Sequence, residues 1–210
     1  KIYGAKYFYL TDSALAPKTA KEFASMLIEE KLDIRWTTFL RFENVYDKEF
    51  LSYLYQAGLR CVSWGLESGS QKILNLMNKG TKIDVIKRIL QDSSMLGIAN
   101  RLTVIYLFPG ETFADFCDTV NFIKENRQNI FQVTFYSYLL KRYSYIYNHM
   151  EEFGIKLTTS DIKSEYRPEE FGFKYDIKDY NKKLQEIAPL IENIYKNPDE
   201  TLLYFSNIEK

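Results

Sequence analysis

The feature that most constrains the fold is a regular alternation of apolar, β-rich runs with segments of helical periodicity. Parallel strands need a long crossover between them, so this alternation is typical of βα units that build a parallel sheet. Right-handed crossovers would wrap five such units into an open or partial barrel of class α/β. We expect strands over residues 6–11, 33–40, 59–66, 102–108 and 130–139, and helices over 17–31, 47–57, 70–77, 82–96 and 112–126.

The pattern changes near residue 150. Residues 156–178 are charged and loop-like, and residues 179–195 have the periodicity of a helix. We therefore predict a partial barrel over residues 1–150 and a C-terminal extension with one helix over 151–210. The exposed edge of the first strand would pair with a second copy or be covered by the apolar residues 202–205.

Composition removes several classes of function. The 28 Lys and Arg residues balance 28 Asp and Glu residues without a basic stripe, so we expect no dedicated nucleic-acid site. The apolar runs are far shorter than the roughly 20 residues that span a bilayer, and we expect no membrane association. Two cysteines and one histidine are too few for a zinc cage or a disulfide framework, which favours the cytoplasm. The chain starts at Lys1 without a leader pattern, and we expect it to be a fragment.

Polar residues gather where the expected strands end. The carboxyl ends of parallel strands meet at one rim, which is where a barrel binds its ligand. Single members also have structural explanations, since Asp12 and Ser70 would cap helices and Glu111 would favour a helix N-terminus. A hydrolase using Asp12, Glu67 and Glu111 is an alternative that needs suitably spaced carboxylates. The rim residues are Thr11, Asp12, Ser13, Arg41, Glu67, Ser68, Gly69, Ser70, Pro109, Gly110 and Glu111.

Two of these segments carry a family resemblance. The run WGLESGSQKILNLMNKG at residues 64–80, followed by FPGET at residues 108–112, resembles the radical S-adenosylmethionine (SAM) superfamily. It is most similar to the branch often preceded by a cobalamin-binding domain, which includes anaerobic oxidative cyclases of magnesium-protoporphyrin ester and many methyltransferases. The resemblance covers about residues 5–155 and implies most of a (βα)6 barrel. The first unit, with its CxxxCxxC loop, would lie before Lys1, so the five strands would be the second to sixth of the family barrel.

The resemblance implies a cofactor role for the rim. Asp12 would contact the ammonium group of SAM, and Arg41 would pair with its carboxylate or with Glu67. Glu67, Ser68 and Ser70 would contact the ribose hydroxyls, and residues 102–108 would lie against adenine. The implied cofactor-binding set is Asp12, Arg41, Glu67, Ser68, Ser70 and Glu111, with no metal ligand and no assigned catalytic residue.

This sequence departs from the family pattern in three places. The CxxxCxxC loop that holds a 4Fe-4S cluster is missing, and we interpret Cys61 and Cys117 as buried structural residues. Leu107 stands where relatives usually have Gly, which puts the adenine pocket in doubt. Tyr145 replaces the Pro of a common Gly-Ser/Thr-Pro turn, so substrate contacts there do not transfer.

The resemblance implies an oxidoreductase-type radical enzyme as the parent protein. Its cluster would reduce SAM and release a 5′-deoxyadenosyl radical, which abstracts hydrogen from a small-molecule or peptide substrate. Flavodoxin or ferredoxin would supply the electron, and the branch also allows cobalamin in the parent. We expect this chain alone to be inactive. The alternative is a non-catalytic binding or scaffold module that has lost its cluster.

Overall fold

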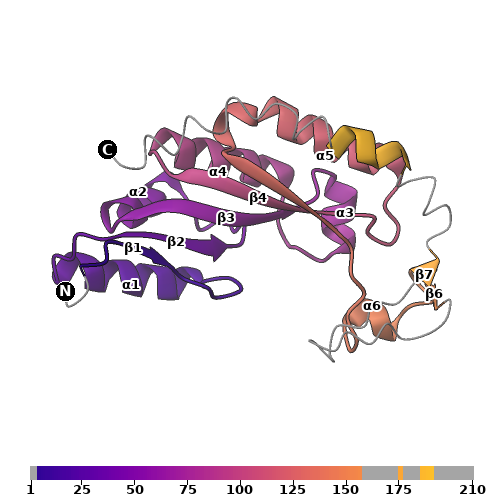
Figure 1. The fold of residues 1–210 in the computed structure, drawn as a ribbon, viewed down its shortest axis with the longest axis horizontal. Coiled ribbons are helices and arrows are strands. Elements are labelled where there is room, and N and C mark those ends of the chain that lie inside the picture. The colour runs from indigo at the N-terminus through magenta and orange to yellow at the C-terminus, as the bar shows by residue number, and fades with distance from the viewer. Residues whose placement is uncertain (1–3, 158–174, 177–184, 192–210) are drawn as a thin grey trace.

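The computed structural model describes residues 4–157, 175–176 and 185–191, and its centre is a curved sheet of five parallel strands (Figure 1). The strand order β1-β2-β3-β4-β5 follows the chain, and every neighbouring pair is parallel. The sheet forms a half-barrel, which confirms the predicted α/β partial barrel. The strands are β1 (Tyr7–Tyr9), β2 (Arg35–Leu40), β3 (Leu59–Glu67), β4 (Ala99–Tyr106) and β5 (Gln132–Ser137).

Helices connect consecutive strands, as the right-handed crossover requires. Local chemistry fixes where they begin. Pro17 stands in the first turn of its helix, Asp47 accepts a hydrogen bond from the Phe50 N–H at 2.8 Å, and Thr112 forms a capping box with Asp115. The helices are α1 (Pro17–Glu29), α2 (Lys48–Gln56), α3 (Gln71–Leu76), α4 (Ile83–Met95), α5 (Phe113–Glu125), a 3₁₀ turn (Arg127–Asn129) and α6 (Tyr145–Asn148).

The main core lies between these helices and the convex face of the sheet. Trp36 and Trp64 are fully buried there, and each indole N–H has a partner: the Ala57 carbonyl at 2.9 Å and the Asn100 side chain at 2.8 Å. Phe42 stacks on Trp64 with ring centroids 4.7 Å apart. Val62, Trp64 and Leu66 of the central strand β3 face this core, so the odd-numbered residues from Cys61 to Glu67 face the concave side of the half-barrel.

Beyond α6 the structure corrects one expectation. Two short strands, β6 (Lys156–Leu157) and β7 (Tyr175–Asp176), pair antiparallel within the segment predicted to be loop-like. Residues 185–191 are helical, inside the predicted helix over 179–195, and Ile187 packs against Leu107 and Phe116. The domain boundary near residue 150 stays a prediction, and residues 202–205 lie outside the described residues. Among the described residues, no helix has the length and apolar character needed to cross a bilayer.

Candidate functional site

The carboxyl ends of the strands form the mouth of the half-barrel. Asp12 and Arg41 are exposed in the segments that follow β1 and β2, and Glu67 is the last residue of β3. Because these strands are parallel and adjacent, the three residues lie at consecutive positions along one rim. Glu111 follows β4 on the same rim but is buried, with 3% exposure.

Glu67 is held in an unusual position. Its backbone has φ of 62°, a left-handed conformation that a residue with a side chain adopts at a cost and that is common at functional sites. A Cβ atom at Gly65 would come within 2.8 Å of Glu67 Oε1, so the glycine leaves room for the carboxylate. Lys79 Nζ donates to Oε1 at 2.9 Å, and the side chain is 14% exposed. One of the two partners expected for Arg41 was Glu67, but in the structure Glu67 pairs with Lys79.

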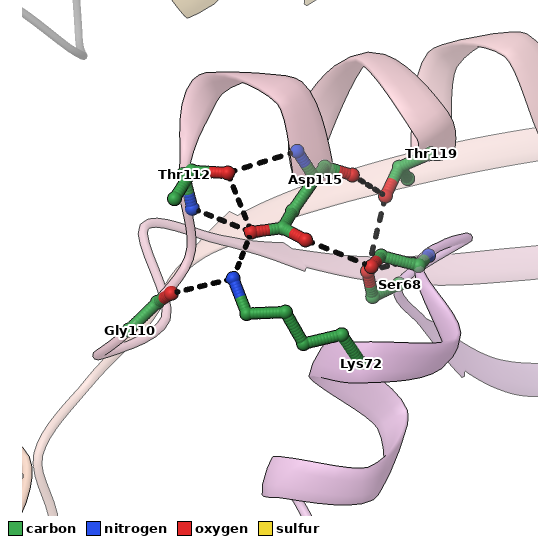
Figure 2. A network of polar contacts seen from close by, with 7 residues as sticks. Ser68, Lys72, Gly110, Thr112, Asp115 and Thr119 are labelled. Carbon is green, nitrogen blue, oxygen red and sulfur yellow. Dashed lines mark hydrogen bonds and ion pairs between the residues drawn. The ribbon is translucent and has the colours of Figure 1, made fainter.

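Ser68 and Ser70 point into the protein. Ser68 is fully buried, its hydroxyl lies 3.1 Å from that of Thr119 on α5, and it accepts the Ser70 N–H at 3.1 Å (Figure 2). The Ser70 hydroxyl donates to Asp115 Oδ1 at 3.0 Å. Although Ser70 stands at the N-cap of α3, its side chain does not cap that helix. Both hydroxyls therefore join the loop after β3 to α5.

Asp115 is the centre of this network. Its Oδ2 accepts hydrogen bonds from Lys72 Nζ at 2.6 Å, from the Thr112 hydroxyl at 2.6 Å and from the Thr112 N–H at 2.9 Å (Figure 2). Lys72 also donates to the Gly110 carbonyl at 3.4 Å. Burial acts to raise the pKa of Asp115, but the donors Lys72, Thr112 and Ser70 outweigh it and lower the pKa to about 2. The carboxylate is ionised at neutral pH and ties together the segments after β3 and β4.

Gly69 explains why the loop approaches α5 so closely. A Cβ atom there would lie 2.6 Å from Thr119 Cα and 2.8 Å from Phe122 Cβ. The Gly69 N–H donates to the Thr119 hydroxyl at 2.9 Å. Only a residue without a side chain fits between β3 and this helix.

A buried hydrogen bond between Leu107 and Glu111 holds the turn after β4. Leu107 has φ of 60° and is 2% exposed, and its N–H donates to Glu111 Oε2 at 2.6 Å. Leu107 adopts a left-handed conformation that a glycine would adopt without cost. Glu111 thus stabilises the turn after β4.

Sequence reasoning missed Lys72, Lys79, Asp115 and Thr119. Part of the signal was available, because Thr112 and Asp115 are spaced as a capping box at the start of α5. The pairing of Asp115 with Lys72, and of Lys79 with Glu67, joins residues from different segments of the chain. No local pattern reports such contacts.

The residues present do not fit an iron-sulfur cluster. Over the residues that the structure describes, no three or more His, Cys, Asp or Glu side chains gather as a metal site would require. Cys61 is buried within β3 and Cys117 lies in α5, as predicted, but Cys117 is only half-buried, which corrects the expectation that both are buried. Burial raises the pKa of the Cys61 thiol, although the nearby Arg101 acts against this shift, so Cys61 is a weak candidate ligand.

Comparison with known sequences gives one family match and several relatives. A sequence model described as the Radical SAM superfamily matches residues 3–123. The bacteriochlorophyllide d C-8(2)-methyltransferase of Chlorobaculum tepidum is 29% identical over 131 residues, which are 60% of this chain and 29% of that protein. An uncharacterized methyltransferase of Pyrococcus horikoshii is 29% identical over 129 residues, 59% of this chain and 27% of that protein. The chain spans less than a third of the length of these relatives.

Solved structures share the fold. The cobalamin-dependent radical enzyme OxsB, with aqua-cobalamin and S-adenosylmethionine bound, gives a TM-score of 0.68 at 15% identity and covers 98% of this chain and 38% of its own. The methyltransferase TsrM from Kitasatospora setae, with tryptophan and a SAM analogue bound, gives 0.63 at 16% identity and covers 87% of this chain and 42% of its own. At this level of identity the likeness concerns the fold alone.

Proposed function

Since the chain belongs to the radical SAM superfamily, we propose that it is the SAM-binding barrel of a methyltransferase-type or oxidative cyclase-type enzyme. The observation that carries the proposal is the placement of Glu67. Its carboxylate stands at the carboxyl end of the central strand, on the concave side, in a strained backbone conformation that the surrounding loop maintains. Methyltransferases among the relatives support the same class of reaction.

We propose that each exposed rim residue contacts a different part of SAM. Glu67 Oε1 is bonded to Lys79, and Oε2 has no hydrogen bond among the described residues, so it is free to accept from a ribose hydroxyl. Asp12 is an exposed carboxylate suited to the ammonium group of SAM, and Arg41 is an exposed guanidinium suited to its carboxylate. We assign Ser68, Ser70 and Glu111 a positioning role, because each already has a partner inside the protein.

The proposal for this chain is limited to binding and orienting SAM. In the superfamily a 4Fe-4S cluster supplies the electron that cleaves SAM, and the residues of this chain do not fit that cluster. We therefore propose that cluster ligands come from another part of a longer protein. Cobalamin-bound neighbours favour cobalamin as a second cofactor of that protein.

The partners follow from the same family assignment. We propose a small-molecule or peptide substrate and a flavodoxin or ferredoxin as electron donor, in the cytoplasm. The balanced charge favours neither nucleic acid nor an anionic membrane surface as a partner.

Calorimetric titration of SAM into the full chain tests the proposal. We expect saturable binding, and we expect Glu67→Gln to weaken it by about tenfold, because a charged acceptor is lost. Glu125→Gln is the matched control, since Glu125 is an exposed carboxylate on α5 that pairs with Lys87. Absence of binding by the unaltered chain, or equal binding by both variants, would contradict the proposal.

One observation favours a second candidate, a binding or scaffold module without a cluster. Both cysteines of the sequence lie inside regular elements rather than in a loop at the mouth. The coding sequence before Lys1 separates the two candidates. A CxxxCxxC motif there supports the enzyme, and a coding sequence without one supports the binding module.

A further inference from the structure

A hollow lies at the opposite end of the barrel interior from the mouth. It has a volume of about 250 Å³ and is formed at the amino ends of the first strands. Its Cys61 and the rim residue Glu67 both belong to β3, about 20 Å apart at the usual rise of a strand. Its lining includes Tyr7, Tyr9, Arg35, Thr37, Arg60 and Arg101.

The hollow has an excess of positive charge. Among its three arginines, Arg35 is paired with the exposed carboxylate of Asp33 at 2.7 Å. Arg60 lies over the Tyr55 ring at 4.0 Å and donates to the Tyr55 carbonyl at 2.7 Å. Within the described ranges, neither Arg60 nor Arg101 has an ion pair. The hollow would therefore attract an anion.

Two buried polar atoms in the hollow lack a strong hydrogen-bond partner. Arg101 Nε is shielded from solvent and makes no hydrogen bond among the described residues. Thr37 Oγ1 is also shielded, and beside it lies the thiol of Cys61, a weak hydrogen-bonding group that leaves the hydroxyl able to donate to a better acceptor. Thr37 on β2 is opposite Cys61 and Arg101 on β4 is opposite Ser63, so the two residues flank the same face of β3. Buried polar groups in proteins are almost always paired, so unpaired ones call for an explanation. A bound oxyanion that accepts hydrogen bonds from both groups would explain them.

The geometry points to a binding site for a small organic oxyanion, a carboxylate or phosphate on a compact planar body. Guanidinium groups bind carboxylate and phosphate through paired N–H donors, and Arg101 Nε is one such donor left unused. Tyr7 and Tyr9, which are 63% and 49% exposed, offer rings for a planar body to contact. The volume is below the roughly 300 Å³ at which pockets for drug-sized ligands begin, which restricts the ligand to a small one.

Titration of the full chain with sodium benzoate and with inorganic phosphate, at constant ionic strength, tests this site. We expect at least one probe to bind with a dissociation constant below about 1 mM. Arg101→Gln should weaken that binding about tenfold or more, because a charged donor is removed. Arg88→Gln is the matched control, since it removes an arginine on α4 that pairs with Asp92 and does not line the hollow, and it should leave the binding unchanged. Stronger binding of benzoate identifies a carboxylate ligand, and stronger binding of phosphate identifies a phosphate ligand.

A second variant covers the case in which Arg101→Gln fails to fold, as judged by circular dichroism. Thr37→Val keeps the shape of the side chain and removes a hydroxyl whose neighbour is the weakly hydrogen-bonding Cys61 thiol. It should not lower the unfolding midpoint, yet it should weaken probe binding severalfold. The site is disproved if neither probe binds saturably, or if Arg88→Gln weakens binding as much as Arg101→Gln. It is also disproved if a folded Arg101→Gln or Thr37→Val binds like the unaltered chain.

Discussion

Lys72 Nζ lies 2.6 Å from Asp115 Oδ2 and joins α3, which follows β3, to the first turn of α5, which follows β4. The Asp115 side chain is only 9% exposed, whereas Lys72 is 54% exposed and bridges from the surface. This contact fixes the loop that carries Glu67 relative to the turn after the next strand. The mouth of the half-barrel is thus held by a polar network rather than by packing alone.

Removing the lysine should destabilise the fold at neutral pH. The pKa of Asp115 lies below its ordinary value of 3.8, at about 2, so the ionised form is favoured by folding. Its stabilisation is complete above pH 4 and is lost as the pH falls through 2. We expect Lys72→Met to lower the free energy of unfolding by about 1 kcal/mol at pH 7 and by less near pH 2. Urea denaturation at both pH values measures the difference.

Lys87→Met is the control for that measurement. Lys87 pairs with Glu125 at 3.2 Å on the surface, with both side chains well exposed, and such pairs contribute little. We expect a loss of less than about 0.5 kcal/mol at either pH. If the two lysine variants lose the same free energy of unfolding at pH 7, burial of Asp115 does not make its ion pair with Lys72 stronger than a surface pair.

Gly69→Ala should be strongly destabilising. The added Cβ would meet the backbone of Thr119 and the Cβ of Phe122 at distances that real structures do not tolerate, so β3 and α5 would have to separate. We expect a loss of about 3 kcal/mol in the free energy of unfolding. Gly80→Ala is the comparison, because nothing lies within 4 Å of that Cβ and only its positive φ opposes the change, at a cost of about 1 kcal/mol. Thermal and urea unfolding should show a clearly larger loss of stability for Gly69→Ala than for Gly80→Ala.

The order of strands and helices was predictable because periodicity is a local property. Caps such as Asp47, and the place of Cys61 within a strand, also follow from neighbouring residues. The strand β4 was predicted three residues late at its start and two residues late at its end. Its end is fixed by the left-handed backbone of Leu107, which an apolar run does not reveal.

The site was predictable only in part. Strand ends identify the rim, so Asp12, Arg41 and Glu67 were placed at the mouth from the sequence. Whether a rim hydroxyl faces the cavity or a neighbouring helix depends on packing, and Ser68 is turned toward Thr119 because Gly69 brings the loop onto α5. Contacts between distant segments of the chain leave no trace in local pattern.

Iron analysis gives a further prediction. Cluster assembly needs several thiolates in one loop, and Cys61 is buried in β3 with a pKa raised by burial. After anaerobic reconstitution with iron and sulfide, followed by desalting, we expect much less than one cluster per chain. The variant with both cysteines changed to Ser should retain the same small amount. A stoichiometric 4Fe-4S spectrum that disappears in this variant would show that Cys61 or Cys117 is a ligand.

At Leu107 we expect the glycine variant to be more stable than the alanine variant, which is the reverse of the usual order within a strand. Its side chain is buried, so Leu107→Ala should cost about 2 to 5 kcal/mol. Leu107→Gly loses the same packing but relieves the left-handed backbone at φ of 60°, which costs a residue with a Cβ about 1 kcal/mol. The bond from its N–H to Glu111 Oε2 remains in both variants. We therefore expect Leu107→Gly to be more stable than Leu107→Ala in urea denaturation. Leu102, which is buried within β4, is the control. At this position we expect the glycine variant to be less stable than the alanine variant. If the two variants have the same order of stability at Leu107 and at Leu102, the backbone of Leu107 is not strained.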